Sequence, residues 1–212
     1  IPKKYPTKEI AKISPQYPYA LSKRMGEELV MHWGKVYKLK VISLRFFNLY
    51  GPRSRTSGTY GAMFGTFLAQ KISGLPFTIV GNGNQKRDFT YVTDAVGAIV
   101  KASKSNINGK IFNVGSGNSI SVNYIVKQLK GKKIFIPKRP GEPEKTFADI
   151  KKIKKYLKWT PKVNIDKGIK LLLKNIDDWK GIGFKSPILS AFMVLNLISL
   201  AGLPPTSGFV GK

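Results

Sequence analysis

The chain has 212 residues, with 37 Lys plus Arg against 11 Asp plus Glu, which gives a formal net charge of +26. It holds no cysteine and one histidine, His32, which excludes disulfides, thiolate zinc sites, iron–sulfur clusters and multi-histidine metal sites, so we expect no metal ion. A hydrophobic content of 42% is enough to form a core and argues against a wholly disordered chain.

The positive charge at first suggests a nucleic acid or an anionic membrane as partner. However, 31 of the basic residues are lysines and 6 are arginines, and arginine is the residue whose planar guanidinium forks onto phosphates and base edges. The densest basic run, 151–158, interleaves lysines with apolar residues, as in a short amphipathic helix. We therefore favour lysines on solvated faces and expect no nucleic-acid partner, with a polyanion-binding module as the lesser alternative.

The first half of the chain begins with a loop rich in proline and lysine, residues 1–16. Apolar periodicity, β-rich runs and glycine or proline breaks then predict a helix over 17–38, a strand over 41–47, a loop to Gly61, a helix over 62–72 and a strand over 77–80. The apolar face of the first helix consists of Met25, Leu29, Trp33 and Val36.

The second half continues the alternation, with strands over 88–92, 111–114 and 134–137 and helices over 93–103, 121–129, 149–157 and from Asn164 onward. Ser121, Asp149 and Asn164 are the expected helix caps. In the helix 93–103 we expect Val96, Ile99 and Val100 to point inward. Strands that alternate with helices of this length predict an α/β fold.

The composition changes sharply near 180–183, where we place a domain boundary. Residues 186–211 carry no charge, and 188–203 are densely apolar on all sides. Because about 20 apolar residues are needed to cross a bilayer, this segment is a borderline transmembrane helix, with a buried C-terminal helix as the alternative.

The most specific chemical feature is the pair Tyr19 and Lys23. On a helix, residues four apart share a face, so a phenol and an ammonium lie side by side. The cation stabilises a tyrosinate, which makes the phenol usable as an acid or base near neutral pH. Alone, the pair is a weak signal, since an exposed tyrosine stacked on a lysine stem has the same spacing.

The surrounding motifs strengthen the signal. They are YPYALSK at 17–23, LRFFNLYGPR at 44–53, GNGNQKRDFTYV at 81–92, FNVGSG at 112–117 and PKRPGEP at 137–143. In this order they resemble the extended short-chain dehydrogenase/reductase family, in particular its NAD-dependent nucleotide-sugar epimerases and dehydratases of the UDP-glucose 4-epimerase type. The resemblance covers about residues 1–180 and implies the C-terminal part of a Rossmann-type α/β fold with a small substrate-binding subdomain.

The resemblance also implies roles and partners. Tyr19 would be the catalytic acid/base, and Lys23 would bind the nicotinamide ribose of NAD beside it. The remaining implied contacts are Phe46 and Phe47 beside the nicotinamide, Asn48 on the substrate phosphate or sugar, Arg87 and Arg139 on the nucleotide diphosphate, and Glu142 on the nucleotide ribose. For Arg87 the structural alternative is an ion pair with Asp88, for Arg139 a solvated loop, and for Asn48 a turn cap.

The implied activity is a nucleotide-sugar 4-epimerase acting on UDP-glucose or UDP-N-acetylglucosamine through a 4-keto intermediate, of use in carbohydrate metabolism and polysaccharide biosynthesis. A 4,6-dehydratase or a decarboxylase of the same family is the alternative, and a membrane-associated component is the alternative of another class. The family also implies a cytoplasmic enzyme and a homodimer when full length.

The sequence departs from the family pattern at both ends. The family's glycine-rich loop, Gly-x-x-Gly-x-x-Gly, does not occur in the 212 residues, so we expect residues 1–180 to lack the N-terminal dinucleotide-binding half and to be inactive alone. Residues 199–212 resemble instead an antiporter-like membrane subunit of NADH–quinone oxidoreductase. We interpret 181–212 as an unrelated segment of a chimera, and any membrane contact would be through 186–212.

Overall fold

The computed structural model describes residues 4–52, 54, 63–138 and 142–179, apart from the side chains of 175–179. The chain divides into two compact units, Ile1–Ile169 and Lys170–Lys212. The elements in chain order are α1 (Pro18–Val36), β1 (Ile42–Phe46), β2 (Asn48–Tyr50), α2 (Met63–Ile72), β3 (Phe77–Val80), β4 (Lys86–Arg87), β5 (Phe89–Tyr91), α3 (Val92–Ser103), β6 (Lys110–Val114), β7 (Ile120–Ser121), α4 (Val122–Leu129), β8 (Lys133–Ile136), α5 (Lys151–Leu157) and α6 (Ile165–Trp179). The predicted alternation of helices and strands is confirmed, and all that follows concerns the first unit.

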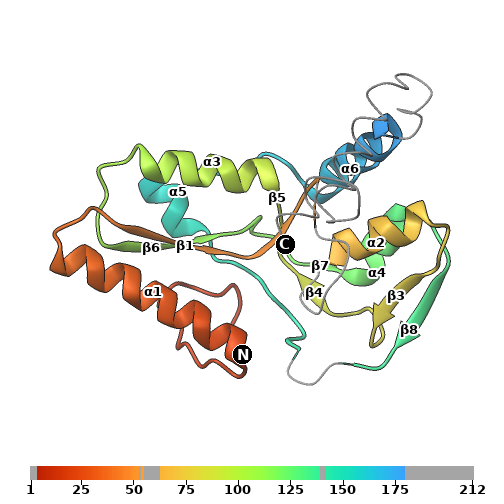
Figure 1. Ribbon diagram of the computed structural model, residues 1–212, viewed down its shortest axis with the longest axis horizontal. Coiled ribbons are helices and arrows are strands. Elements are labelled where there is room, and N and C mark those ends of the chain that lie inside the picture. The colour runs from red at the N-terminus through yellow and green to blue at the C-terminus, as the bar shows by residue number, and fades with distance from the viewer. Residues whose placement is uncertain (1–3, 53, 55–62, 139–141, 180–212) are drawn as a thin grey trace, which may run out of the picture. The chain divides into compact units, whose positions relative to one another are not determined.

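The strands of this unit pair two by two, mostly in parallel. β1 pairs with β6, β2 with β5 and β3 with β8, all in parallel, while the short β4 and β7 pair antiparallel. In Figure 1, α1 lies on one side of β1 and β6, and α3 and α5 lie on the other. Parallel pairing with helical crossovers is the arrangement of a doubly wound α/β fold, so the α/β part of the predicted fold class is confirmed.

β1 and β2 are successive stretches of one strand that changes its neighbour at Phe47. The Phe47 N–H donates to the Val114 carbonyl of β6 at 3.0 Å, and the next N–H, that of Asn48, donates to the Asp88 carbonyl at 3.0 Å. Open parallel sheets bind ligands beyond the carboxyl ends of their strands, where neighbouring strands diverge. This change of neighbour therefore places Asn48 where a ligand site is expected.

The core under α3 and α5 is apolar and closely packed. Its buried members are Ala98, Phe112, Val114, Ala148, Ile150, Ile153, Leu157 and Trp159. Ile42 and Leu44 of β1 pack against this cluster, while Ser43 and Arg45, which alternate with them, bond to α1. The period-2 alternation of the strand thus gives β1 one apolar face and one polar face.

The inward face predicted for the helix 93–103 was wrong. Val96, Ile99 and Val100 are 52%, 48% and 43% exposed, and the buried face of α3 is formed by Asp94, Ala95 and Ala98. The small alanine side chains let the helix axis approach the strands closely. The apolar stripe of α1 is exposed in the same way, since Met25 and Leu29 are 59% and 58% exposed.

Two of the three predicted caps are confirmed. The Ser121 hydroxyl accepts a hydrogen bond from the Tyr124 N–H at 3.2 Å, and the Asn164 side chain accepts one from the Lys167 N–H at 2.9 Å. α5 begins one residue later than predicted, so that Ile150 is its N-cap. Asp149 still accepts a hydrogen bond from the Lys151 N–H, at 2.9 Å.

The predicted apolar C-terminal helix, residues 186–211, lies outside the described residues. Among the helices that are described, none is both long and apolar enough to span a membrane.

Candidate functional site

Tyr19 and Lys23 lie side by side in the first turns of α1, as predicted. Pro18 occupies the first helical position, where its missing N–H removes no hydrogen bond and its fixed φ favours the helix. The Lys23 ammonium lies 5.2 Å from the centre of the Tyr19 ring, and the Tyr19 side chain is 47% exposed. The positive end of the helix dipole is also at this end of α1. The phenol is therefore accessible and has positive charge beside it.

An ion pair fixes α1 on β1. Arg45 donates from Nε and Nη2 to the two carboxylate oxygens of Glu27, at 2.7 and 2.6 Å, and the Ser43 hydroxyl donates to Glu27 at 3.1 Å. The hydrogen bonds from Arg45 lower the pKa of Glu27 below its ordinary value, against the effect of burial. A bidentate pair restricts both the distance and the orientation of its partners, so it positions the helix that carries Tyr19.

Phe46 and Phe47, expected beside a nicotinamide, have different environments. Phe46 ends β1 and is 38% exposed. Phe47 packs against the apolar core cluster and is partly buried. Phe46 is thus the side chain of the two with surface available to a ligand.

Asn48 lies exposed at the start of β2. Its backbone N–H donates to the Asp88 carbonyl at 3.0 Å, and its side-chain Oδ1 accepts a hydrogen bond from the Thr146 hydroxyl at 3.1 Å. The Thr146 oxygen in turn accepts the Asp88 N–H at 3.0 Å. Three segments far apart in the sequence therefore meet at Asn48.

Arg87 is nearly buried, at 7% exposed, and its carboxylate partner is Glu142, with Nη2 donating to Oε1 at 2.8 Å. The structural alternative of an ion pair with Asp88 was wrong, since the Asp88 carboxylate accepts hydrogen bonds from Ser116, Gly117 and Ala148 instead. The Arg87 Nη1 donates to the Lys86 carbonyl at 2.9 Å, so two of its five N–H donors are used within the described residues. Arg87 and Glu142, which the sequence predicted as separate ligand contacts, are thus brought together, whereas Arg139 lies outside the described residues.

A cavity of 480 Å³ lies beside this pair. Its charged lining residues are Glu142, Glu144, Lys86, Lys138 and Lys145. Because Glu144 pairs with Lys138 and Glu142 pairs with Arg87, Lys86 and Lys145 leave a net positive charge, which favours an anionic ligand.

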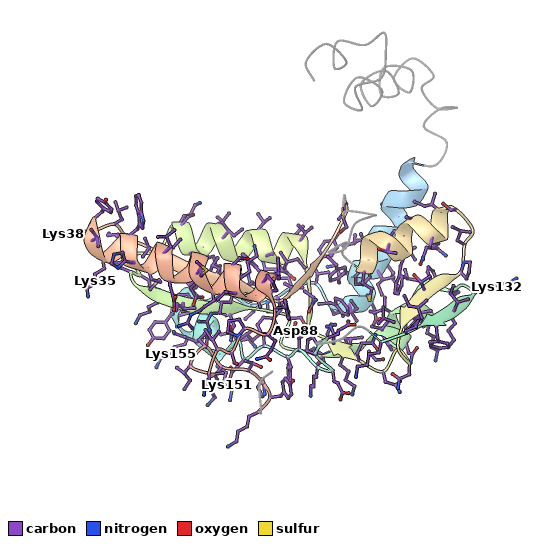
Figure 2. The ribbon with its side chains drawn as sticks, turned by 60° about the horizontal axis from the view of Figure 1, so that its bottom comes forward. Lys35, Lys38, Asp88, Lys132, Lys151 and Lys155 are labelled. Carbon is purple, nitrogen blue, oxygen red and sulfur yellow. The ribbon has the colours of Figure 1, made fainter. Side chains whose placement is uncertain are left out.

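Asp88, labelled in Figure 2, is fully buried. Its carboxylate links the site to two further loops, one at 116–117 and one at Ala148. One carboxylate oxygen accepts from the N–H and hydroxyl of Ser116, at 2.6 and 2.7 Å. The other accepts from the N–H groups of Gly117 and Ala148, at 3.2 and 3.0 Å. Burial nevertheless raises the pKa of Asp88 above its ordinary value, against these hydrogen bonds.

The lysines that give the chain its charge contrast with this buried carboxylate. Figure 2 shows Lys35, Lys38, Lys132, Lys151 and Lys155 at the periphery of the molecule, and all five are exposed. Arg87, in contrast, is held by hydrogen bonds to the Lys86 carbonyl and to Glu142, which lines the cavity.

Comparison with known proteins shows the family of the chain. The profile of the NAD dependent epimerase/dehydratase family matches residues 2–115. The chain belongs to this family. An uncharacterized UDP-glucose epimerase from Bacillus subtilis, YtcB, is 34% identical over 168 residues, which are 76% of this chain and 52% of that protein. The chain spans about half the length of the curated relatives that it matches.

Solved structures agree with this assignment. UDP-glucose 4-epimerase from Thermotoga maritima with UDP-glucose has a TM-score of 0.77 at 31% identity, over 83% of this chain and 58% of that one. A variant of UDP-glucuronic acid 4-epimerase from Bacillus cereus, in complex with UDP-4-deoxy-4-fluoro-glucuronic acid and NAD, has a TM-score of 0.76 at 31% identity, over 84% and 58%. The Rossmann-like α/β fold of the epimerase family is therefore present in this chain.

A second profile, that of the NADH:quinone oxidoreductase/Mrp antiporter transmembrane family, matches residues 167–212. Most of that stretch, from residue 180 onward, lies outside the described residues.

Three features of this epimerase/dehydratase chain were not predicted from its sequence: the Glu27–Arg45 pair, the buried Asp88 carboxylate and the Thr146 hydroxyl. Glu27 lies in no motif, Arg45 lies in the LRFFNLYGPR motif but was given no role, and Asp88 was considered only as a partner of Arg87. Thr146 follows the PKRPGEP motif by three residues, so its proximity to a recognised motif was the one available signal.

Proposed function

We propose that the chain carries the nucleotide-sugar site and the catalytic tyrosine of an NAD-dependent nucleotide-sugar 4-epimerase of the UDP-glucose or UDP-N-acetylglucosamine type. The observation that carries the proposal is the Tyr19–Lys23 pair, with the Lys23 ammonium 5.2 Å from the phenol ring at the exposed start of α1, in a member of the epimerase/dehydratase family. Exposure leaves the phenol accessible to a sugar hydroxyl, and the adjacent cation balances the charge of a tyrosinate.

In the proposed reaction the Tyr19 oxygen takes the proton of the C4 hydroxyl of the sugar and later returns it. NAD, when bound, supplies the hydride acceptor and donor for C4. Lys23 donates to a ribose hydroxyl and keeps positive charge beside the phenol oxygen. The 4-keto sugar then turns its other face before it is reduced, which requires that the diphosphate be held while the sugar is free to rotate.

Arg87 is suited to hold that diphosphate. Three of its N–H donors make no hydrogen bond within the described part of the chain, and its guanidinium is fixed by Glu142 and the Lys86 carbonyl. A fixed guanidinium loses little entropy when it binds a phosphate bidentately. We propose that Arg139 adds a second cation, that Glu142 accepts from a ribose hydroxyl of the nucleotide, and that Asn48 bonds the phosphate or sugar.

The residues present fit one end of the cofactor. The phenol and ammonium of α1 are suitable donors for the nicotinamide ribose, and the exposed Phe46 ring offers an apolar surface beside the nicotinamide. No glycine-rich diphosphate loop occurs in the 212 residues. We therefore propose that residues 1–180 are the C-terminal part of the epimerase domain and do not turn over substrate alone.

We further propose that 181–212 is a separate segment unrelated to the epimerase domain, in keeping with the antiporter-type match at 167–212. Membrane contact would be through this segment. The epimerase part would be cytoplasmic, and homodimeric when joined to its other half.

The decisive experiment is product analysis. The coding sequence upstream of Ile1 is read, and the protein that it encodes together with residues 1–180 is incubated with UDP-glucose and NAD. We expect UDP-galactose, and its loss in Tyr19→Phe with UDP-glucose binding retained. Formation of only a 6-deoxy-4-keto sugar would replace the epimerase by a dehydratase, and formation of a pentose from UDP-glucuronate would replace it by a decarboxylase.

A further inference from the structure

The Thr146 hydroxyl lies between two functional segments of the site. Its oxygen is 3.0 Å from the Asp88 nitrogen and 3.1 Å from the Asn48 Oδ1. Asp88 directly follows Arg87, the residue proposed to bind the diphosphate. This one hydroxyl therefore contacts both the backbone next to Arg87 and the side chain of Asn48, which is proposed to bind the phosphate or sugar.

The direction of each hydrogen bond follows from the number of protons. A backbone N–H is always a donor, so the Thr146 oxygen accepts from Asp88. A threonine hydroxyl has a single proton, and an amide carbonyl oxygen can only accept. The Thr146 proton is therefore given to the Asn48 Oδ1, which turns the Asn48 Nδ2 group away from Thr146.

The threonine is itself held in place. Its backbone N–H donates to the Lys86 carbonyl at 3.0 Å, and its carbonyl accepts from the Ser119 hydroxyl at 2.9 Å. Its β-branched side chain has few accessible rotamers. Within the described residues the Asn48 Nδ2 makes no hydrogen bond, and the Asn48 side chain is exposed. The two Nδ2 protons are thus directed to solvent or ligand.

We propose that Thr146 is a positioning residue that fixes the Asn48 amide with its NH₂ group toward the ligand, so that Asn48 donates to a phosphate oxygen of the nucleotide sugar. The inference rests on the proposed function for the identity of the ligand, but not for the orientation of the amide. It explains why an amide is suited to position 48. A carboxylate could also accept from Thr146 but would repel a phosphate, and an amide with the opposite orientation would present its carbonyl to the anion.

The test compares Thr146→Val with Thr146→Ser in the 212-residue chain. UDP is the probe, and the readouts are its dissociation constant and the ¹⁵N–¹H signals of the Asn48 side chain, assigned by their loss in Asn48→Asp. We expect Thr146→Val to weaken UDP binding about five- to tenfold, the value of one hydrogen bond, and to shift or broaden the Asn48 signals. Thr146→Ser should restore both. Thr90→Val is the matched control, because within the described residues the buried Thr90 hydroxyl has no hydrogen-bond partner, and it should change neither readout.

Unchanged Asn48 signals and UDP affinity in Thr146→Val would overturn the proposal, as would a failure of Thr146→Ser to restore them. If the parent chain does not bind UDP, the proposed function fails, while the Asn48 signals still test the positioning. If Thr146→Val does not fold, the orientation of the Asn48 amide is measured in the parent chain. We expect a weak nuclear Overhauser effect between the Asn48 Nδ2 protons and the Thr146 methyl group. A strong effect would show the opposite orientation and overturn the proposal.

Discussion

Glu27 of α1 and Arg45 of β1 form a fork-to-fork ion pair across the junction of helix and strand, with N–O distances of 2.6 and 2.7 Å. The side chains are 12% and 25% exposed, so the pair is largely shielded from water. Arg45 also donates to the Glu9 carbonyl at 2.9 Å, which extends the contact to the segment that precedes α1. The catalytic helix of the proposed enzyme is thus oriented by a polar contact and not by its apolar stripe.

Replacing Glu27 by Gln should destabilise the chain by about 1–3 kcal/mol near pH 7, because Arg45 keeps its charge without a counter-charge. The folded-state pKa of Glu27 is lowered from its ordinary value of 4.5. Its contribution is therefore present above pH 4.5 and is lost as the pH falls through the lowered folded value. Urea denaturation between pH 3 and 7 should show the parent and the variant converging at the acid end.

Glu28→Gln is the control for this prediction. Glu28 pairs with Arg24 one turn along the same helix, but its side chain is 57% exposed. Exposed pairs contribute little, so the change in the free energy of unfolding should stay below about 0.5 kcal/mol. Equal losses in both variants would mean that the Glu27–Arg45 pair has no special role.

Replacing Asp88 by Asn should destabilise the chain by about 2–3 kcal/mol, although the two side chains have the same shape. Both carboxylate oxygens accept from N–H or O–H donors, and an amide nitrogen in either place would face two donors. The matched change is Asp149→Asn, since Asp149 is also buried, but within the described residues its carboxylate accepts a single N–H, that of Lys151, which the amide oxygen can still accept. Thermal unfolding of both variants measures the difference, and a neutral Asp88→Asn would contradict it.

The features that could be predicted from the sequence are those that depend on residues close together in the chain. Ser121 and Asn164 were predicted as caps because a cap depends on residues within one turn. The face of α3 was mispredicted because periodicity shows which residues share a face, but not which face a strand will cover: Ala98 is buried and Val96 is exposed. The Thr146–Asn48 contact joins residues 98 apart in the sequence, and no local pattern encodes such a pairing.

Tyr50→Phe should leave the free energy of unfolding unchanged or raise it by about 1 kcal/mol. Tyr50 is 2% exposed, and within the described residues its hydroxyl has no hydrogen-bond partner. Burial raises the pKa of this phenol above its ordinary value, so it stays neutral and uncompensated. Phenylalanine keeps the stacking on Phe64, at 4.5 Å between ring centres, and removes a buried polar group.

Tyr124→Phe should behave in the opposite way. The Tyr124 hydroxyl donates to Asp166 at 2.8 Å at the surface, so its removal should cost about 0.5–1 kcal/mol. Chemical denaturation of both variants under one set of conditions compares them directly. A clear loss of stability in Tyr50→Phe would show that its hydroxyl has a partner.

Arg87→Lys should weaken UDP binding about tenfold, because an ammonium cannot bond Glu142, the Lys86 carbonyl and a phosphate with the fixed geometry of a guanidinium. Isothermal titration at two salt concentrations measures the affinity, and the loss should be similar at both, because the substitution keeps the charge and Arg87 is nearly buried. Arg24→Lys, at an exposed pair on α1, is the control and should leave the affinity unchanged. If Arg87→Lys lowers stability but leaves UDP affinity intact, Arg87 serves only to hold Glu142, and the diphosphate must be bound elsewhere.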